Sequence, residues 1–168
     1  MAGNSSDGTA AFEQMMARLD YPMFVVTTRA GTERSGCLVG FACQASIHPP
    51  RFLVGLSKLN HTFRVARRAT HLAVHLLTRR HRELAGLFGA ETGDRIDKFA
   101  HCAWEDGPAG VPILTDAAGW FAGRVLDRLD LGDHVGHLIE PVAGVVPAGT
   151  GPLLTYSDVH GLDAGHEA

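Results

Sequence analysis

The sequence lacks the features of a membrane, secreted or nucleic-acid-binding protein. No apolar run among its 168 residues reaches the ~18–20 residues needed to span a bilayer. Residues 1–9 are small and polar, without the hydrophobic centre of a signal peptide. The three cysteines form no C-x-x-C pair, and the formal net charge of −3 gives no general attraction to nucleic acid or lipid. These absences predict a soluble cytoplasmic protein with reduced thiols.

The common catalytic motifs are also missing. The chain contains no G-x-G-x-x-G after a strand, no G-x-x-x-x-G-K-[ST], no H-E-x-x-H and no G-x-S-x-G. Ten histidines suggest a metal site, and the closest pairs are His71 with His75 and His134 with His137. Both pairs fall in expected strands, where an i, i+3 pair points to opposite faces and an i, i+4 pair lies roughly 13 Å apart. We therefore predict no metal.

Segments with strand character dominate the chain. A hydrophobic share of 45% and the length of 168 residues predict a single domain over residues 1–168, with flexible tails at about 1–9 and 158–168. Because few helices alternate with the strands, the pattern favours a mainly β, antiparallel barrel with peripheral helices over a parallel sheet. Expected strands cover 23–28, 37–47 (relaxing into an irregular loop), 52–56, 71–77, 113–114, 117–129 and 134–142; expected helices cover 12–19, the start at His61, 78–89 and 95–99.

Polar and small residues gather at two strand ends. Gln44, Ala45 and Ser46 precede Pro49-Pro50, and a second group from Ser57 to Thr62 opens a helix. A helix start beside Lys58 and His61 could bind a phosphate. Ordinary capping by Asn60 accounts for the same residue types, and spacing alone favours capping.

The order of several short motifs resembles the flavin reductase-like family, whose members have the FMN-binding split-barrel fold. Each motif is weak alone, whereas their joint order and spacing are specific. The motifs are Ser46 to Pro50, Phe52 to Leu56, Ser57 to Thr62, Lys98-Phe99 with Trp104, Pro112 to Leu114, and Gly132-Asp133-His134.

This resemblance implies an antiparallel split barrel and a homodimeric NAD(P)H:flavin oxidoreductase. Hydride would pass from NADH or NADPH to FMN or FAD, and the reduced flavin could supply a separate monooxygenase. The sequence leaves both nucleotide choices open. The resemblance also implies site residues: Leu38, Val39, Gly40, Gln44, Ala45 and Ser46 along the flavin ring and ribityl chain; Ser57, Lys58, His61 and Thr62 around its phosphate; Phe99 at the edge of the nicotinamide pocket; and His134 seating the nicotinamide.

The chain departs from the family pattern at three places, which keeps other functions open. Val39-Gly40-Phe41, Gln44 and His48 stand where polar, small hydroxyl and acidic residues are usual. One alternative is a carrier or storage protein for flavin, deazaflavin or haem without nicotinamide turnover, and another is a structural or regulatory dimer. His134 and Phe99 could equally be structural residues. The pair Trp120-Phe121 could pack across a two-fold axis.

Overall fold

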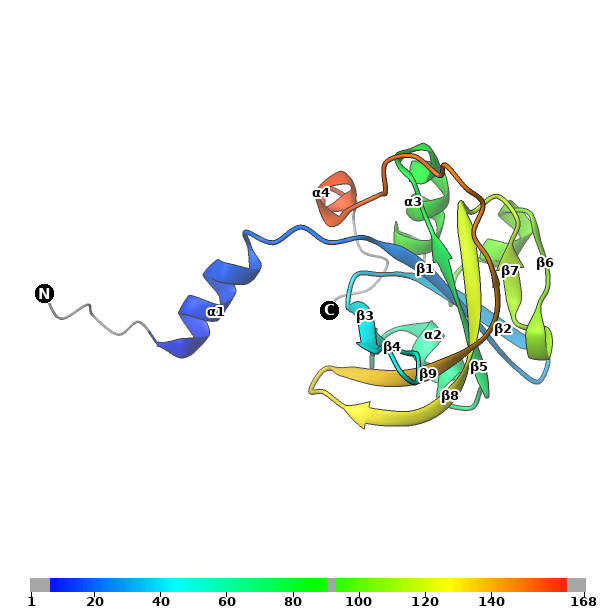
Figure 1. The fold of residues 1–168 in the computed structure, drawn as a ribbon, viewed down its shortest axis with the longest axis horizontal. Helices are drawn as coiled ribbons and strands as arrows, with labels where there is room; N and C mark the ends of the chain where they lie inside the picture. Colours follow the sequence, from blue (N-terminus) through cyan, green and yellow to red (C-terminus); the bar gives the residue numbers. More distant parts are fainter. Residues whose placement is uncertain (1–6, 91–92, 163–168) are drawn as a thin grey trace, which may run out of the picture.

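The computed structural model describes residues 7–90 and 93–162. Its main element is a seven-stranded antiparallel sheet with the order β2-β1-β5-β8-β9-β4-β3, which curls into a barrel (Figure 1). The barrel is not closed, because β2 and β3 are the two edges of the sheet. The expected antiparallel split barrel is therefore confirmed. The strands are β1 (Phe24–Ala30), β2 (Glu33–Val39), β3 (Ala42–Ser46), β4 (Arg51–Ser57), β5 (His71–Leu76), β8 (Gly119–Asp130) and β9 (His134–Val145).

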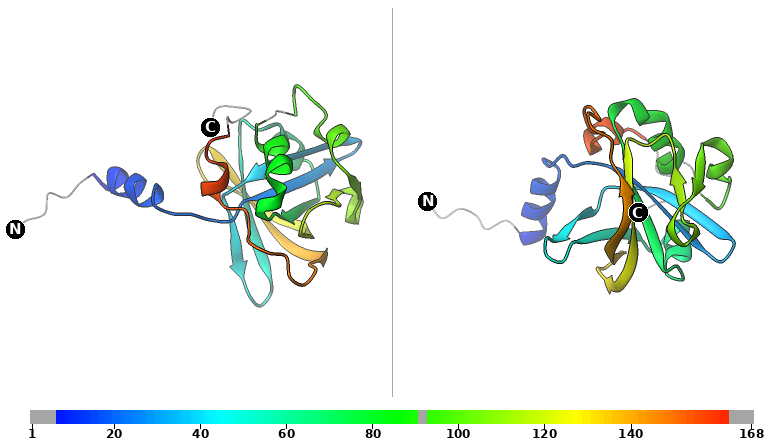
Figure 2. Two further views of the ribbon diagram at one scale, coloured as in Figure 1. Left: turned by 90° about the horizontal axis from the view of Figure 1, so that it is seen from above. Right: turned by 45° about the vertical axis from the view of Figure 1, so that its right-hand side comes forward.

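Short helices and a two-stranded ribbon surround the sheet, as the turned views show (Figure 2). None of the helices among the described residues is both long and apolar enough to cross a bilayer. The helices are α1 (Gly8–Met16), α2 (His61–Ala66), α3 (Arg82–Ala90) and α4 (Tyr156–Val159), with 3₁₀ turns at Arg79–His81, Lys98–His101 and Pro108–Gly110; the ribbon is β6 (Trp104–Asp106) with β7 (Pro112–Leu114).

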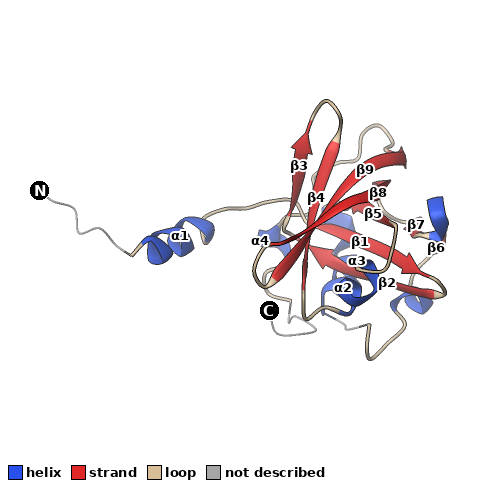
Figure 3. Cartoon of the chain, turned by 90° about the horizontal axis from the view of Figure 1, so that it is seen from below, coloured by secondary structure: helices blue, strands red, loops and turns tan. Residues whose placement is uncertain are grey.

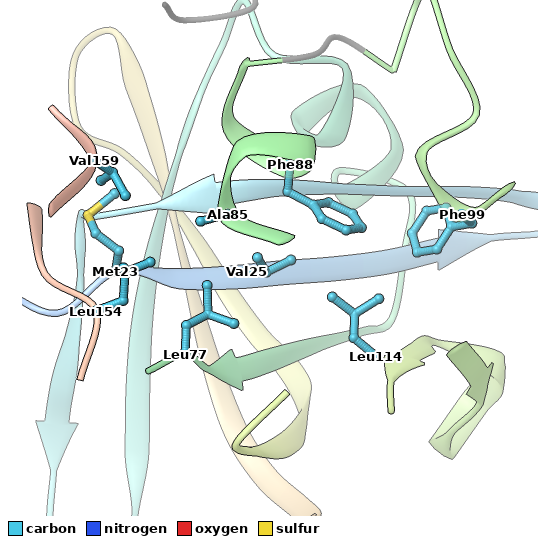
Figure 4. Packing of buried hydrophobic residues seen from close by; sticks show 9 residues of the cluster. All are labelled: Met23, Val25, Leu77, Ala85, Phe88, Phe99, Leu114, Leu154 and Val159. Atoms are coloured by element: carbon cyan, nitrogen blue, oxygen red, sulfur yellow. The ribbon is translucent and has the colours of Figure 1, made fainter. Parts of the chain in front are cut away.

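Strand β1 is buried on both faces and divides the core in two. Val25 points to a cluster beneath α3 and α4 that includes Leu77 and Phe88 (Figure 4). Val26, the next residue, points into the barrel. Adjacent strand residues face opposite ways, so a continuous apolar run is what a strand covered on both sides requires. The remaining barrel cluster is formed by Cys37, Val39, Val54, Leu56, Ala66, Leu72, Val74 and Ile139.

The structure corrects the expected loop within 37–47. Strand β2 begins at Glu33 and ends at Val39, and β3 then pairs with β4 in the register Ala42 to Val54 and Gln44 to Phe52. The residues of β3 are small and have weak strand propensity. Pairing with the strongly strand-forming β4 overrides that propensity.

Two further expectations concern the ends of the chain. The expected helix at 12–19 forms earlier, as α1, and stands clear of the barrel with no buried residue (Figures 1 and 3). In the expected C-terminal tail, Val159 is buried in the core and Asp158 forms ion pairs with Arg79 and Arg82. The segments 1–6 and 163–168 lie outside the described residues.

Candidate functional site

A small cavity with aromatic walls lies between the end of β2, strand β4, the start of β9 and α4. It has a volume of about 160 Å³, and we call it the His134 cavity. Two glycines let neighbouring residues approach the backbone closely. A Cβ atom on Gly40 would stand 2.6 Å from the ring of Tyr21, and one on Gly55 would stand 3.2 Å from the Cβ and from the backbone oxygen of Phe41. The lining residues are Tyr21, Met23, Gly40, Phe41, Gly55, His134 and Tyr156.

His134 is held in this cavity by strand pairing and by its neighbour. The first residue of β9, it is paired with Ser57 at the end of β4. Its Nδ1 lies 2.7 Å from a carboxylate oxygen of Asp133, and this hydrogen bond lowers the pKa of Asp133. The imidazole ring lies 4.9 Å from the ring of Phe41, centroid to centroid. Asp133 and Phe41 thus restrict the orientation of the ring.

Lys58 lies beside His134 but is engaged by acidic groups. Its backbone amide donates to the carbonyl of Asp133, and its Nζ lies 3.0 Å from Asp130 across the β8–β9 turn. The amide of Gly132 and this ammonium group lower the pKa of Asp130. Lys58 is therefore a cation at the edge of the site that an anionic ligand would share with Asp130.

The start of α2 shows the capping that the spacing favoured. The side chain of Asn60 accepts a hydrogen bond from the amide of Thr62 at 2.9 Å. Thr62 is buried, and its hydroxyl lies 2.9 Å from the hydroxyl of Ser35. Ser57 accepts from the amide of Leu59. The hydroxyls of Ser57 and Thr62 thus stabilise the turn and the helix start.

His61 faces a different opening, which we call the polar cleft. This cleft has a volume of about 460 Å³. The imidazole of His61 lies 2.9 Å from the Ser35 hydroxyl and 3.2 Å from Glu33. Charges of both signs line the cleft, since Arg34, Arg95 and Lys98 accompany Glu33, Asp94 and Asp97.

Phe99 lies at the inner end of the polar cleft and belongs to the core. It is 5% exposed and packs edge-on against Phe88 and Trp104. The guanidinium group of Arg34 lies 4.7 Å from the centroid of Trp104. Lys98 is buried and donates to the carbonyls of Gly36 and Phe88. These contacts pack Phe99 and Trp104 against the core, and Phe99 does not line the His134 cavity.

The remaining predicted residues lie along β2 and β3. Leu38 packs against Gly89 of α3, where an added Cβ would stand 2.9 Å from it, while the Val39 side chain is in the barrel core. Ala45 is exposed. Gln44 and Ser46 border a further cavity of about 240 Å³ with Arg51, Phe52 and Phe121.

The structure therefore brings together only part of the predicted set. Gly40 and His134 share one cavity, with Ser57 and Lys58 next to it, whereas His61 and Gln44 face other openings. The sequence analysis missed Tyr21 and Tyr156, whose stacked rings lie 5.1 Å apart on the wall of the His134 cavity. No local spacing signals this pair, because its members come from opposite ends of the chain.

Flavin and nicotinamide rings both bind between flat, mostly apolar walls. Tyr21, Phe41 and Tyr156 give the His134 cavity walls of this kind. Its volume of about 160 Å³ is below the ~300–1,000 Å³ of typical small-molecule sites. The chemistry fits one ring, and this cavity does not enclose a pair of stacked rings. Among the described residues, no group of three or more His, Cys, Asp or Glu side chains is arranged for a metal ion.

The fold defines an antiparallel split-barrel protein. The flavin reductase like domain model matches residues 16–161, and the chain belongs to this family. An FMN reductase (NADH) RutF from Methylorubrum extorquens is 31% identical over 149 residues, which cover 89% of this chain and 72% of that protein.

Solved structures agree. A flavin reductase domain protein from Arthrobacter sp. FB24 superposes with a TM-score of 0.78 and 30% identity, covering 88% of this chain and 90% of that one. An oxidoreductase from Sinorhizobium meliloti superposes with the same TM-score at 24% identity, which shows a shared fold alone. The match covers 90% of this chain but only 51% of that longer chain.

Proposed function

We propose that this chain is an NAD(P)H-dependent flavin reductase whose reaction centre is the His134 cavity. The observation that carries the proposal is the meeting of Gly40, Phe41 and His134 on one aromatic-walled cavity, in a chain of the flavin reductase-like family. FMN or FAD is the hydride acceptor and NADH or NADPH the donor. The RutF relative, named an FMN reductase (NADH), favours FMN and NADH as the first pair to test.

The protein contributes position and water exclusion to this reaction. When bound, a reduced nicotinamide supplies a hydride that the flavin accepts. Phe41 and Tyr21 place aromatic rings on the cavity wall, and the missing Cβ of Gly40 leaves room for the Tyr21 ring against the backbone. Asp133 holds Nδ1 of His134, which leaves Nε2 to hydrogen-bond the nicotinamide nucleotide. Lys58 attracts the flavin phosphate from the edge of the site.

A second copy of the chain completes the site in this proposal. The His134 cavity alone is too small for stacked flavin and nicotinamide rings, and Phe41 at its edge is 60% exposed. A two-fold dimer would add a wall and cover that side chain. We further propose that the dimer works in the cytoplasm and releases reduced flavin to a separate monooxygenase, because the barrel itself offers little room for a third, organic substrate.

Anaerobic mixing of the purified protein with flavin and reduced nicotinamide tests the proposal. All four combinations of FMN or FAD with NADH or NADPH are followed by loss of the visible flavin absorption. We expect rapid bleaching with at least one pair, and none after the protein is heat-unfolded. Tight flavin binding without bleaching would establish the carrier or storage alternative instead. A colourless protein that ignores added flavin would establish the structural alternative.

A further inference from the structure

Helix α1 presents an apolar face that the described part of its own protomer does not cover. Phe12 and Met15 are each 61% exposed, Met16 is 39% exposed, and Leu19, just beyond the helix, is 52% exposed. Helical periodicity gathers Phe12, Met15 and Met16 on one side of α1, with Gln14 on the opposite side. No residue of α1 is buried. Such a face is stabilised by contact with a second apolar surface.

The root of α1 is fixed to the barrel and directs the helix away from it. The carboxylate of Asp20 accepts hydrogen bonds from the amide and hydroxyl of Ser157, both at 2.9 Å. The carbonyl of Tyr21 accepts from the amide of Tyr156, and the Met23 amide donates to Leu154. With this anchor in place, α1 extends outward in both the first view and the view from above (Figures 1 and 2). The helix is therefore placed to contact another molecule.

A matching surface lies at the edge of the sheet. Strand β3 is an edge strand, and its residues 43–45 are exposed. At its end stands Ile47, which is 68% exposed. An uncovered edge strand with an exposed apolar flank invites unwanted strand pairing, and proteins commonly cover such an edge with a helix. The described part of the chain thus carries an uncovered apolar helix face and an uncovered edge strand with the exposed apolar Ile47 at its end.

We propose that α1 is an arm exchanged between two copies of this chain, so that the apolar face of each arm packs on β3 and Ile47 of the other copy. The inference rests on the homodimer in the proposed function and assigns its contact surfaces. A two-fold axis makes both contacts identical and leaves no free arm. A large side chain buries ~150–250 Å², and the exposures of the four residues add up to about two fully exposed side chains, so each arm offers ~300–500 Å². If each receiving surface buries a similar area, the two arms and two surfaces together bury ~1,200–2,000 Å², the size of a standard stable interface.

The exchange also places the partner beside the reaction centre. Tyr21, at the root of the arm, and Phe41, next to β3, both line the His134 cavity. A second copy that contacts both the arm and the β3 edge therefore lies against the open side of this cavity. Dimer formation and enclosure of the flavin are coupled through these two residues.

Two charge-introducing variants and their mixture test the exchange by sedimentation equilibrium. The arm variant is Phe12→Asp with Met15→Asp, the surface variant is Ile47→Asp, and Gln14→Asp is the matched control on the polar face of α1. We expect each homodimer to weaken about 100-fold, because both arm contacts are lost, and the control to keep the wild-type dissociation constant. In an equal mixture, one intact arm meets one intact surface. The mixed dimer should therefore be only about tenfold weaker than wild type.

Three results would overturn the arm exchange. The wild-type protein could be monomeric, both variants could dimerise as tightly as wild type, or the mixture could dimerise no more tightly than either variant alone. Thermal unfolding checks that the barrel is intact in each variant, as expected for exposed positions. Flavin reduction is measured on the same samples. A wild-type protein that is monomeric and active would refute the exchanged arm and support the reductase function. A wild-type protein that is dimeric and inactive would refute the reductase function and leave the exchanged arm standing.

Discussion

His75 should make the stability of the protein depend on pH between about 6.5 and 4. It is 0% exposed near the C-terminal end of β5, and burial lowers its pKa from 6.5 to about 4. Its Nδ1 donates to the carbonyl of Val25 at 2.9 Å, so its Nε2 accepts from the amide of Leu114 at 3.0 Å. If Nε2 were protonated, it would become a donor that faces the donor N–H of Leu114, and the hydrogen bond between them would be lost. The folded state therefore holds His75 neutral and ties β7 to the main sheet through it.

The magnitude follows from the two pKa values. The unfolded chain binds a proton near pH 6.5, whereas the folded chain resists it until about pH 4. Stability is thus complete above pH 6.5, declines as the pH falls, and stops declining near pH 4. The gap between the values corresponds to ~3 kcal/mol. A domain of this size has a total stability of about 5–15 kcal/mol, so this loss would be readily measured.

Urea unfolding of wild type and His75→Gln at a series of pH values measures this contribution. The variant cannot titrate, so its loss of unfolding free energy between pH 7 and 4 should be ~3 kcal/mol smaller than that of wild type. His48→Gln is the control, because His48 is exposed, and it should follow the wild-type curve. Parallel curves for wild type and His75→Gln would refute the reasoning.

Four further substitutions separate the roles of individual residues. His134→Ala should raise the KM for NAD(P)H more than the flavin Kd, and Lys58→Glu should do the opposite; equal effects on flavin affinity in a titration would contradict this division. Gly40→Ala should cost ~1–3 kcal/mol in urea unfolding, because its Cβ meets Tyr21 at 2.6 Å; full wild-type stability would count against this close contact. His137 is 0% exposed and its Nε2 has no partner among the described residues. His137→Leu should therefore raise the free energy of unfolding by ~1 kcal/mol at pH 7. A lower urea midpoint for this variant than for wild type would contradict the prediction.

The strands were predictable because burial determines their composition. Val25 and Val26 sit in a continuous apolar run, and that run marks a strand covered on both faces. Strand β3 was missed because its stability comes from pairing with β4, a partner that its own small residues do not reveal.

The site was less predictable than the fold for similar reasons. The family resemblance gave Gly40 and His134, which share the cavity. Tyr21 and Tyr156 come together only when the segments that lead into β1 and into α4 meet in the fold, and no sequence period records that contact. The pairing of Lys58 with Asp130 likewise depends on where the β8–β9 turn folds.

The measurement that tests the central claim most directly is a single anaerobic turnover with NADH carrying deuterium at C4 of the nicotinamide. If the protein holds the two rings for direct hydride transfer, flavin bleaching should be slower with the deuterated donor than with ordinary NADH, and it should require folded protein. No bleaching with either donor, or the same rate without the folded protein, would contradict the account.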